Sequence, residues 1–329
     1  MTRRLPVPVL AVALAALLGV SWWLQHREQT APPSVPPVVL VPATLNVEGL
    51  TVLELSTGKP ATPQVRLVHT AGQSWQVATL SNAPADPERL RRVVDLLRGL
   101  TGEVRATGKR WFPAFLVEDE KALRLVLRQG DLVVCDLLIN RSPKQSQVSF
   151  VRRRDSDVIC AVEDNLLGKV ADVWGDFSVS PLTSVVWADL RVFPLEASAV
   201  ESVELAERVK EAWVTRSERH APLDADAQGV VNTLVGWRAR AVVDPATQAE
   251  ALTTPRWRWL VTERGGGRWE IEEAAAPPKP AKEAPAPTVA LRRLPSGPGL
   301  TMEFGAVQSL REQLLSPPKK TTAPAAKKS

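Results

Sequence analysis

The most constraining feature of this chain is a residue pattern that occurs twice at a fixed separation. Trp75 stands before a predicted helix that opens at Asp86, and Trp213 stands before one that opens at Asp224, so the interval is the same in both copies. The residue numbers of the two tryptophans differ by 138 (213 minus 75). Because long-period self-similarity is typical of a duplicated unit, the sequence predicts one fold built twice. The match runs without a gap. It begins where Val65 and Leu67 align with Val203 and Leu205, and it ends where Val93 and Leu96 align with Val231 and Leu234.

Each copy is predicted to be an antiparallel sheet with one main helix, an α+β unit. Short apolar runs joined by tight connections are typical of such sheets. The first helix has the clearest signals, because Asp86 is a good N-cap, Pro87 suits the first helical position, and apolar residues follow at helical spacing. At 329 residues and 44% hydrophobic content the chain can bury two cores.

An uncharged segment, Leu5 to Leu24, predicts a transmembrane helix that anchors the protein in a membrane. As a helix it would span about 30 Å, the thickness of a bilayer's hydrocarbon core. Arg3 and Arg4 precede it, and Trp22 and Trp23 close it at the depth where aromatic rings favour the interface. We therefore expect a single-pass protein of the bacterial inner membrane, with its N-terminus cytoplasmic and its bulk periplasmic or otherwise extracytoplasmic. The rival, a cleaved signal peptide, lacks a small-x-small cleavage site.

These observations divide the chain into seven predicted parts. They are a cytoplasmic N-terminus (1–4), a transmembrane anchor (5–24), a Pro-rich tether (25–45), repeat domain 1 (46–181), repeat domain 2 (182–315), a disordered loop inside it (274–288), and a disordered tail (316–329).

Charge argues against nucleic acid as a partner. Four tail lysines and the two N-terminal arginines carry six positive charges, one more than the formal net charge of +5. The remaining chain is therefore nearly neutral. The run Arg152 to Arg154, followed by Asp155 and Asp157, is interpreted as a solvated hairpin tip.

No motif for catalysis or for a cofactor accompanies the repeat. His26, His69 and His220 are isolated from one another, and metal sites need clustered ligands. Carboxylate pairs such as Asp155 with Asp157 fit capping or solvated positions better than acid–base work. The run Gly265 to Gly267 lacks the following helix and Lys of a phosphate loop. We therefore predict a non-enzymatic protein with no cofactor and no metal.

Two residue types leave alternatives open. Cys135 and Cys160 either form a disulfide between strands or serve as small core residues. Trp257 and Trp259 alternate on one side of a predicted strand, with Trp269 across a Gly hairpin. These rings either belong to the core or form a surface for a partner or ligand.

The order of anchor, strand, Trp, Asp-capped helix and terminal hairpin resembles the bacterial domain-of-unknown-function family 4340. The resemblance covers roughly residues 46–315. The family's Gly-Leu-Asp-x-Pro segment is reduced here to Leu252, Thr253, Thr254 and Pro255 in the second copy. Because genes of that family commonly lie beside ABC exporters of the gliding-motility type, the resemblance implies an accessory or scaffold protein of an ABC-type transport or motility-type envelope system. Its expected partners are an integral permease or other envelope proteins. The alternative is a cell-wall or polysaccharide-binding module, which requires exposed Trp257 and Trp259.

Overall fold

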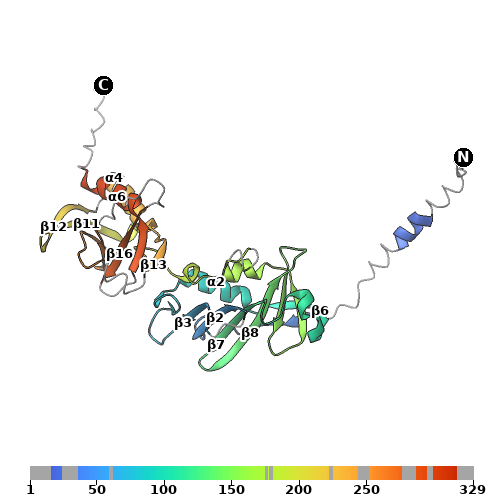
Figure 1. Ribbon diagram of the computed structural model, residues 1–329. Coiled ribbons are helices and arrows are strands. Elements are labelled where there is room, and N and C mark those ends of the chain that lie inside the picture. The colour runs from blue at the N-terminus through green and yellow to red at the C-terminus, as the bar shows by residue number, and fades with distance from the viewer. Residues whose placement is uncertain are drawn as a thin grey trace, which may run out of the picture.

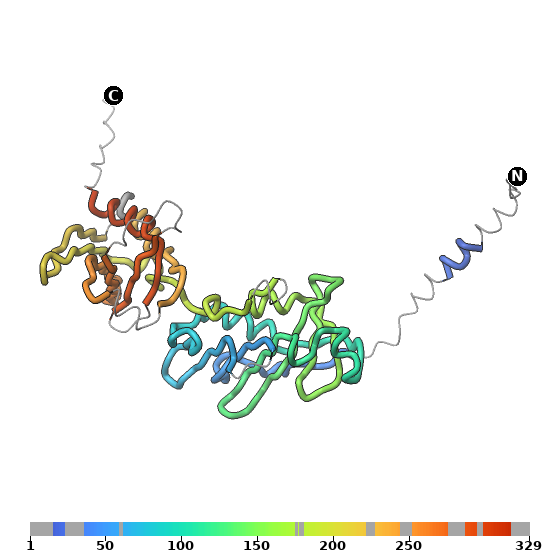
Figure 2. Tube along the Cα trace, viewed as in Figure 1, coloured from blue at the N-terminus to red at the C-terminus, as the bar shows by residue number. Residues whose placement is uncertain are grey.

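The computed structural model describes residues 16–23, 36–58, 62–174, 177, 181–221, 225–243, 252–275, 287–294 and 299–316. Two large antiparallel sheets dominate these residues, one of ten strands and one of seven. Each sheet has its own apolar core. The fold is mostly β, so the predicted α+β class is wrong. Figure 1 draws the sheets as two bodies, and Figure 2 shows the chain passing once from the first body to the second.

The first sheet has the strand order β1-β6-β10-β9-β8-β7-β2-β3-β4-β5. Its strands are β1 (Val38–Val39), β2 (Val52–Thr57), β3 (Val65–Val68), β4 (Gln76–Val77), β5 (Ala83–Pro84), β6 (Thr101–Thr107), β7 (Leu123–Gln129), β8 (Leu132–Arg141), β9 (Ser149–Arg153) and β10 (Val158–Val162). Every pairing in it is antiparallel.

Helix α2 (Pro87–Leu97) covers the inner face of the first sheet. The Asp86 carboxylate accepts hydrogen bonds from the backbone N–H groups of Glu88 and Arg89 at 2.9 and 3.1 Å, so the predicted N-cap is confirmed. Its buried stripe is Leu90, Val93, Val94 and Leu97. Short helical turns follow at Lys109–Trp111, α3 (Phe112–Phe115) and Leu167–Ala171.

The second sheet has the strand order β12-β11-β14-β15-β16-β17-β13. Its strands are β11 (Val200–Val209), β12 (Ala212–His220), β13 (Ala241–Val243), β14 (Trp257–Glu263), β15 (Arg268–Glu273), β16 (Thr288–Leu294) and β17 (Gly299–Glu303). Helices α4 (Ala225–Gly236) and α6 (Phe304–Leu315) pack on its inner face.

The two sheets share one topology. Part of the first follows the order β3-β2-β7-β8-β9-β10-β6, and the whole of the second follows β12-β11-β14-β15-β16-β17-β13, with a helix before β6 and before β13. The register matches as well. Leu125 opposes Leu137 in the first sheet and Trp259 opposes Ile271 in the second, so both residue numbers rise by 134 (259 minus 125 and 271 minus 137). We call the two bodies the first and second units.

Equivalence extends to the start of each unit. The backbone N–H of Leu40 donates to the carbonyl of Leu100 at 2.8 Å, and that of Val192 donates to the carbonyl of Trp237 at 3.0 Å. A proline stands two positions after each donor, at Pro42 and Pro194. The segment before β11 therefore takes the place that the segment around β1 takes in the first unit.

The predicted alignment, with its constant offset of 138, is wrong in detail. It set Val65 of β3 against Val203 of β11, but the strand order makes β12 the counterpart of β3. Trp75 lies in the connection between β3 and α2, which contains β4 and β5, whereas Trp213 lies inside β12. The first unit has extra strands at this point, so no single offset can align the copies.

Segment 184–193 joins the units by hydrogen bonds to both. The carbonyl of Trp187 accepts from the N–H of Asp86 at 2.8 Å, and the N–H of Asp189 donates to the carbonyl of Pro84 at 2.8 Å. On the other side, the N–H of Ala239 donates to the carbonyl of Leu190 at 2.8 Å. Trp187 is buried in the first core and Phe193 in the second.

The membrane anchor is not supported. No helix among the described residues is long and apolar enough to cross a membrane. Of the segment Leu5 to Leu24, the structure describes residues 16–23, which are helical. Trp22 and Trp23 are 61% and 50% exposed, while Arg3, Arg4 and the rest of Leu5 to Leu24 lie outside the described residues. The described residues therefore do not support the predicted single-pass location in the inner membrane.

Other predictions lie partly or wholly outside the described residues. These are most of the tether, the Asp224 helix cap, the centre of the loop 274–288, and the tail from residue 317 onward.

Candidate functional site

A ladder of ion pairs lies on the outer face of the first sheet, the face opposite α2. The Arg124 guanidinium donates two hydrogen bonds to the Asp136 carboxylate, from Nε at 2.9 Å and from Nη2 at 2.8 Å. Arg154 lies 3.9 Å from Asp136 and 3.5 Å from Asp119. Arg154 therefore links two carboxylates into one network.

Arg152 ends this ladder as a buried residue. Its side chain is 5% exposed, donates to Asp119 at 3.0 Å, and lies 4.1 Å from the centre of the Phe112 ring. It also donates to several backbone carbonyls, including that of Val117. The interpretation of Arg152 to Arg154 as a wholly solvated tip is therefore wrong for Arg152. The cause is the α3 turn, which covers this end of the sheet.

The second sheet carries a corresponding ladder on its outer face. Arg258 donates to Glu272 at 3.0 Å and lies 2.9 Å from Glu270. Glu272 also accepts a hydrogen bond from Arg292. The Arg258 guanidinium stacks over the Trp213 ring at 4.2 Å.

The two ladders occupy equivalent places. The residue numbers of Arg258 and Glu270 exceed those of Arg124 and Asp136 by 134 (258 minus 124 and 270 minus 136), the same offset as the strand register. In each unit the arginine pairs diagonally with an acid on the next strand. The strand order adds further equivalent positions: Arg152 and Arg153 of β9 correspond to Arg292 and Arg293 of β16, and Glu54 of β2 corresponds to Glu204 of β11.

The alternative in which Trp257, Trp259 and Trp269 form an exposed surface is not supported by their burial. Trp257 is 8% exposed and Trp259 is fully buried. Trp259 packs edge-to-face on Trp237 at 5.3 Å. Of the three rings, Trp269 alone is partly exposed, so of the two open alternatives the core role holds for Trp257 and Trp259.

A buried carboxylate lies behind these rings. Glu273 is 1% exposed, accepts a hydrogen bond from Trp259 Nε1 at 3.0 Å, and accepts another from Arg311 of α6. Burial raises the pKa of Glu273, and the charge of Arg311 offsets this only in part. These partners are structural, since they tie α6 to the sheet.

The two cysteines are free and buried, so of the two open alternatives the role of small core residues holds. Cys135 lies on β8 and Cys160 on β10, with β9 between them. Two strand spacings are about 9.6 Å, beyond the roughly 7 Å limit for a disulfide's Cα atoms. Burial raises the pKa of the Cys135 thiol to about 12, so this group stays protonated and is a poor nucleophile.

Within the described ranges, no three His, Cys, Asp or Glu side chains gather so that they could hold a metal ion. His69 stacks on Trp75 at 5.2 Å, and His220 lies 2.9 Å from Glu218, both outside the cores. His26 lies outside the described residues.

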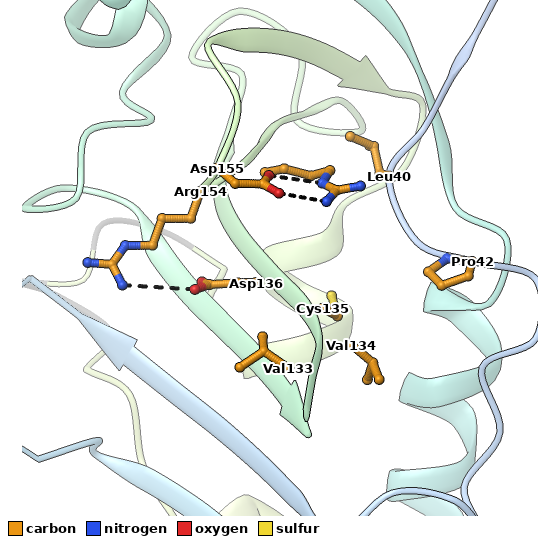
Figure 3. Close-up of a pocket in the computed structure, with 9 residues that line it drawn as sticks. Leu40, Pro42, Val133, Val134, Cys135, Asp136, Arg154 and Asp155 are labelled. Atoms are coloured by element: carbon orange, nitrogen blue, oxygen red, sulfur yellow. Dashed lines mark hydrogen bonds and ion pairs between the residues drawn. The ribbon is translucent and has the colours of Figure 1, made fainter. Parts of the chain in front are cut away.

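A cavity of about 600 Å³ opens at one end of the first unit (Figure 3). Figure 3 shows the Arg154 side chain directed at Asp136 on one side, and Asp155 in an ion pair with an arginine on the other. That arginine is Arg153, which donates to Asp155 at 3.1 and 2.7 Å. The apolar walls come from Leu40, Pro42, Val133, Val134 and Cys135.

Comparisons with known proteins give no match: no family model, no curated protein and no solved structure is similar to this chain. The resemblance to family 4340 therefore stays a prediction.

The sequence-based prediction missed the two ladders, although a signal was present. The segments Phe150 to Arg153 and Ala290 to Arg293 each end an apolar strand with two consecutive arginines. The two segments correspond through the strand order of the sheets. An alignment with one constant offset of 138 does not place them opposite each other, so it misses the correspondence.

Proposed function

We propose that this chain is a non-enzymatic scaffold or accessory protein that binds a partner protein across the outer faces of its two sheets. The observation that carries the proposal is the recurrence of one ion-pair geometry, Arg124 with Asp136 and Arg258 with Glu270.

Stability alone is a weak reason for this recurrence. The side chains of Arg124 and Asp136 are 31% and 22% exposed, and those of Arg258 and Glu270 are 28% and 22% exposed. Partly exposed ion pairs contribute about 0 to 1 kcal/mol to folding, and more where they are bidentate or networked, which is still small beside the roughly 2–5 kcal/mol of a buried leucine. The inner faces of the units have meanwhile changed from leucine to tryptophan. A pair that recurs while the core around it changes supports a role for the surface itself.

The ladders suit recognition better than catalysis. The four ladder carboxylates are each paired with an arginine, so their oxygens are engaged in that contact: Asp119, Asp136, Glu270 and Glu272. The side chains are held on rigid strands, which lowers the entropy lost on binding. Alternating charges select a partner of complementary pattern and orient it.

The class of partner comes from the resemblance stated above. It implies an integral permease or another envelope protein of an ABC-type transport or motility-type system. The polysaccharide alternative receives no support, because its stacking rings, Trp257 and Trp259, lie in the core.

Cross-linking in the host cell followed by purification of the full chain tests the proposal. We expect the wild-type chain to recover a permease, and the double variant Arg124→Glu, Arg258→Glu to recover at least ten-fold less. Arg92→Glu is the matched control, because Arg92 is 68% exposed on α2, away from the outer face. Circular dichroism verifies that each variant is folded.

Two results would count against it. Absence of any permease in the wild-type sample would remove the accessory role. Equal recovery with the double variant would remove the outer faces as the contact surface.

A further inference from the structure

The cavity of the first unit lies where the second unit holds a tryptophan side chain. Cys135 opposes Leu127 in the first sheet, and Trp269 opposes Val261 in the second. Both residue numbers rise by the same 134 (269 minus 135 and 261 minus 127). Cys135 and Trp269 are therefore equivalent. A small thiol in one unit replaces an indole in the other.

The second unit shows how that space is occupied. The Arg293 guanidinium lies 5.6 Å from the centre of the Trp269 ring, within the range of a cation–π contact. Arg293 also donates to the carbonyl of Arg191, in the segment that opens the unit. The indole Nε1 donates to Glu263. The ring thus lies against a cation that is itself bonded to the opening segment.

The first unit keeps these surroundings without the ring. Arg153 is the counterpart of Arg293, and Leu40 of the opening segment lines the cavity. The Arg153 guanidinium donates two hydrogen bonds to Asp155 at the cavity wall. A volume of about 600 Å³ with mixed apolar and charged walls falls in the size range of small-ligand sites.

We propose that this cavity binds an aromatic ring of indole size, with Arg153 against the ring face and Leu40, Val133 and Val134 around it. The charge complementarity is that of Arg293 and Trp269, since a guanidinium attracts the electron-rich face of an indole. Asp136 and Arg154 of the first ladder also line this cavity, but the test below uses the purified chain and a free probe, so its result does not depend on the partner proposed for the outer faces.

The ring could be carried by a free small molecule or by a tryptophan of another polypeptide. Both share the chemistry that the cavity recognises. Competition between two probes separates these sources.

Fluorine NMR with 5-fluoroindole tests the site without interference from the chain's own tryptophans. We expect saturable broadening and shift of the probe signal with wild-type protein. Cys135→Trp should weaken binding at least ten-fold, because the new side chain occupies the cavity as Trp269 does. Cys135→Ala keeps the space open and should bind as the wild type does.

The reciprocal substitution sharpens the test. Trp269→Cys should create a second site, so that two probe molecules bind per chain. Arg153→Gln should weaken binding by about three- to five-fold through loss of the cation–π contact. These variants keep the proposal testable even when Cys135→Trp does not fold.

Each outcome either tests whether the cavity binds an aromatic ring or shows which kind of molecule carries that ring. No saturable binding to the folded wild type, or undiminished binding to folded Cys135→Trp or Arg153→Gln, would overturn it. Displacement of the probe by N-acetyl-tryptophanamide supports a ring borne by a polypeptide. Binding of 5-fluoroindole without such displacement supports a free small aromatic molecule.

Discussion

The two units keep one strand order and one register but fill their interiors differently. At equivalent positions of β7 and β14 the first unit buries Leu123 and Leu125 where the second buries Trp257 and Trp259. Backbone pairing depends on main-chain groups, which every side chain leaves available, whereas core packing depends on side-chain volume. A duplicated sheet can therefore preserve its topology while its core is rebuilt with residues of another size.

The units also differ at the edge next to β3 and β12. In the first unit β4 and β5 continue the sheet beyond β3, while in the second no strand among the described residues lies beyond β12. That edge carries Arg216, Glu218 and Arg219, and the register slips beside Arg216. Charged side chains and irregular pairing are known to discourage further strand addition.

The largest effect on stability is expected from truncating a large buried side chain in one core at a time. Trp259→Ala should lower the free energy of unfolding by about 3–5 kcal/mol, and the equivalent Leu125→Ala by about 2–5 kcal/mol. Each side chain is fully buried in its own core. Calorimetry should show that each variant lowers one melting transition and leaves the other in place. A single transition lowered by either substitution would show that the units unfold together.

A smaller effect is expected where the second unit opens. Arg191 donates to Asp189 at 2.9 and 2.8 Å, and the corresponding positions of the first unit, Pro37 and Val39, cannot form such a pair. Burial acts to raise the pKa of Asp189, but the hydrogen bonds and charge of Arg191 lower it overall below the ordinary value of an aspartate. A depressed carboxyl pKa adds stability that is present above the unfolded-state pKa and is lost as the pH falls through the folded-state pKa.

Asp189→Asn should therefore cost about 1–2 kcal/mol near pH 7. The gap between wild type and variant should close in acid, as the wild-type carboxyl becomes protonated. Denaturant unfolding at a series of pH values measures this gap. A gap that is constant down to pH 2 would rule out the ionised pair as its cause.

The smallest effect concerns the helices. Gly229 lies inside α4, and its equivalent in α2 is Arg92, because Val94 and Leu97 of α2 match Val231 and Leu234 of α4 at the same spacing. A Cβ added at Gly229 meets nothing within 4 Å, so Gly229→Ala should stabilise the second unit by about 0.5–1 kcal/mol. Arg92→Ala is the control and should change stability by less than about 0.5 kcal/mol. Thermal melts compare them, and an unchanged or lowered melting temperature for Gly229→Ala would contradict the expectation.

Much of the secondary structure was predictable because its causes are local. Asp86 caps its helix through two backbone N–H groups only two and three positions away. Gly130 likewise separates two apolar runs, Ala122 to Leu127 and Leu132 to Ile139, which predict a hairpin, and strands β7 and β8 begin and end within two positions of these runs. Strand β6, Thr101–Thr107, was missed because Gly102 and Ala106 give it little apolar pattern.

The sites were less predictable because each depends on register between strands. Arg124 and Asp136 meet across two strands whose pairing shifts at a bulge near Leu127. The predicted membrane anchor is not supported, because no helix among the described residues is long and apolar enough to cross a membrane.

By itself, the sequence determined that the chain repeats, where α2 begins, and that most apolar runs are short strands, because these features depend on neighbouring residues and on composition. Only the tertiary structure decided which strands correspond, that Trp257 and Trp259 are buried, and that a cavity stands at the position equivalent to Trp269. Those outcomes depend on pairing and packing between residues far apart in the chain, and local pattern carries no measure of either.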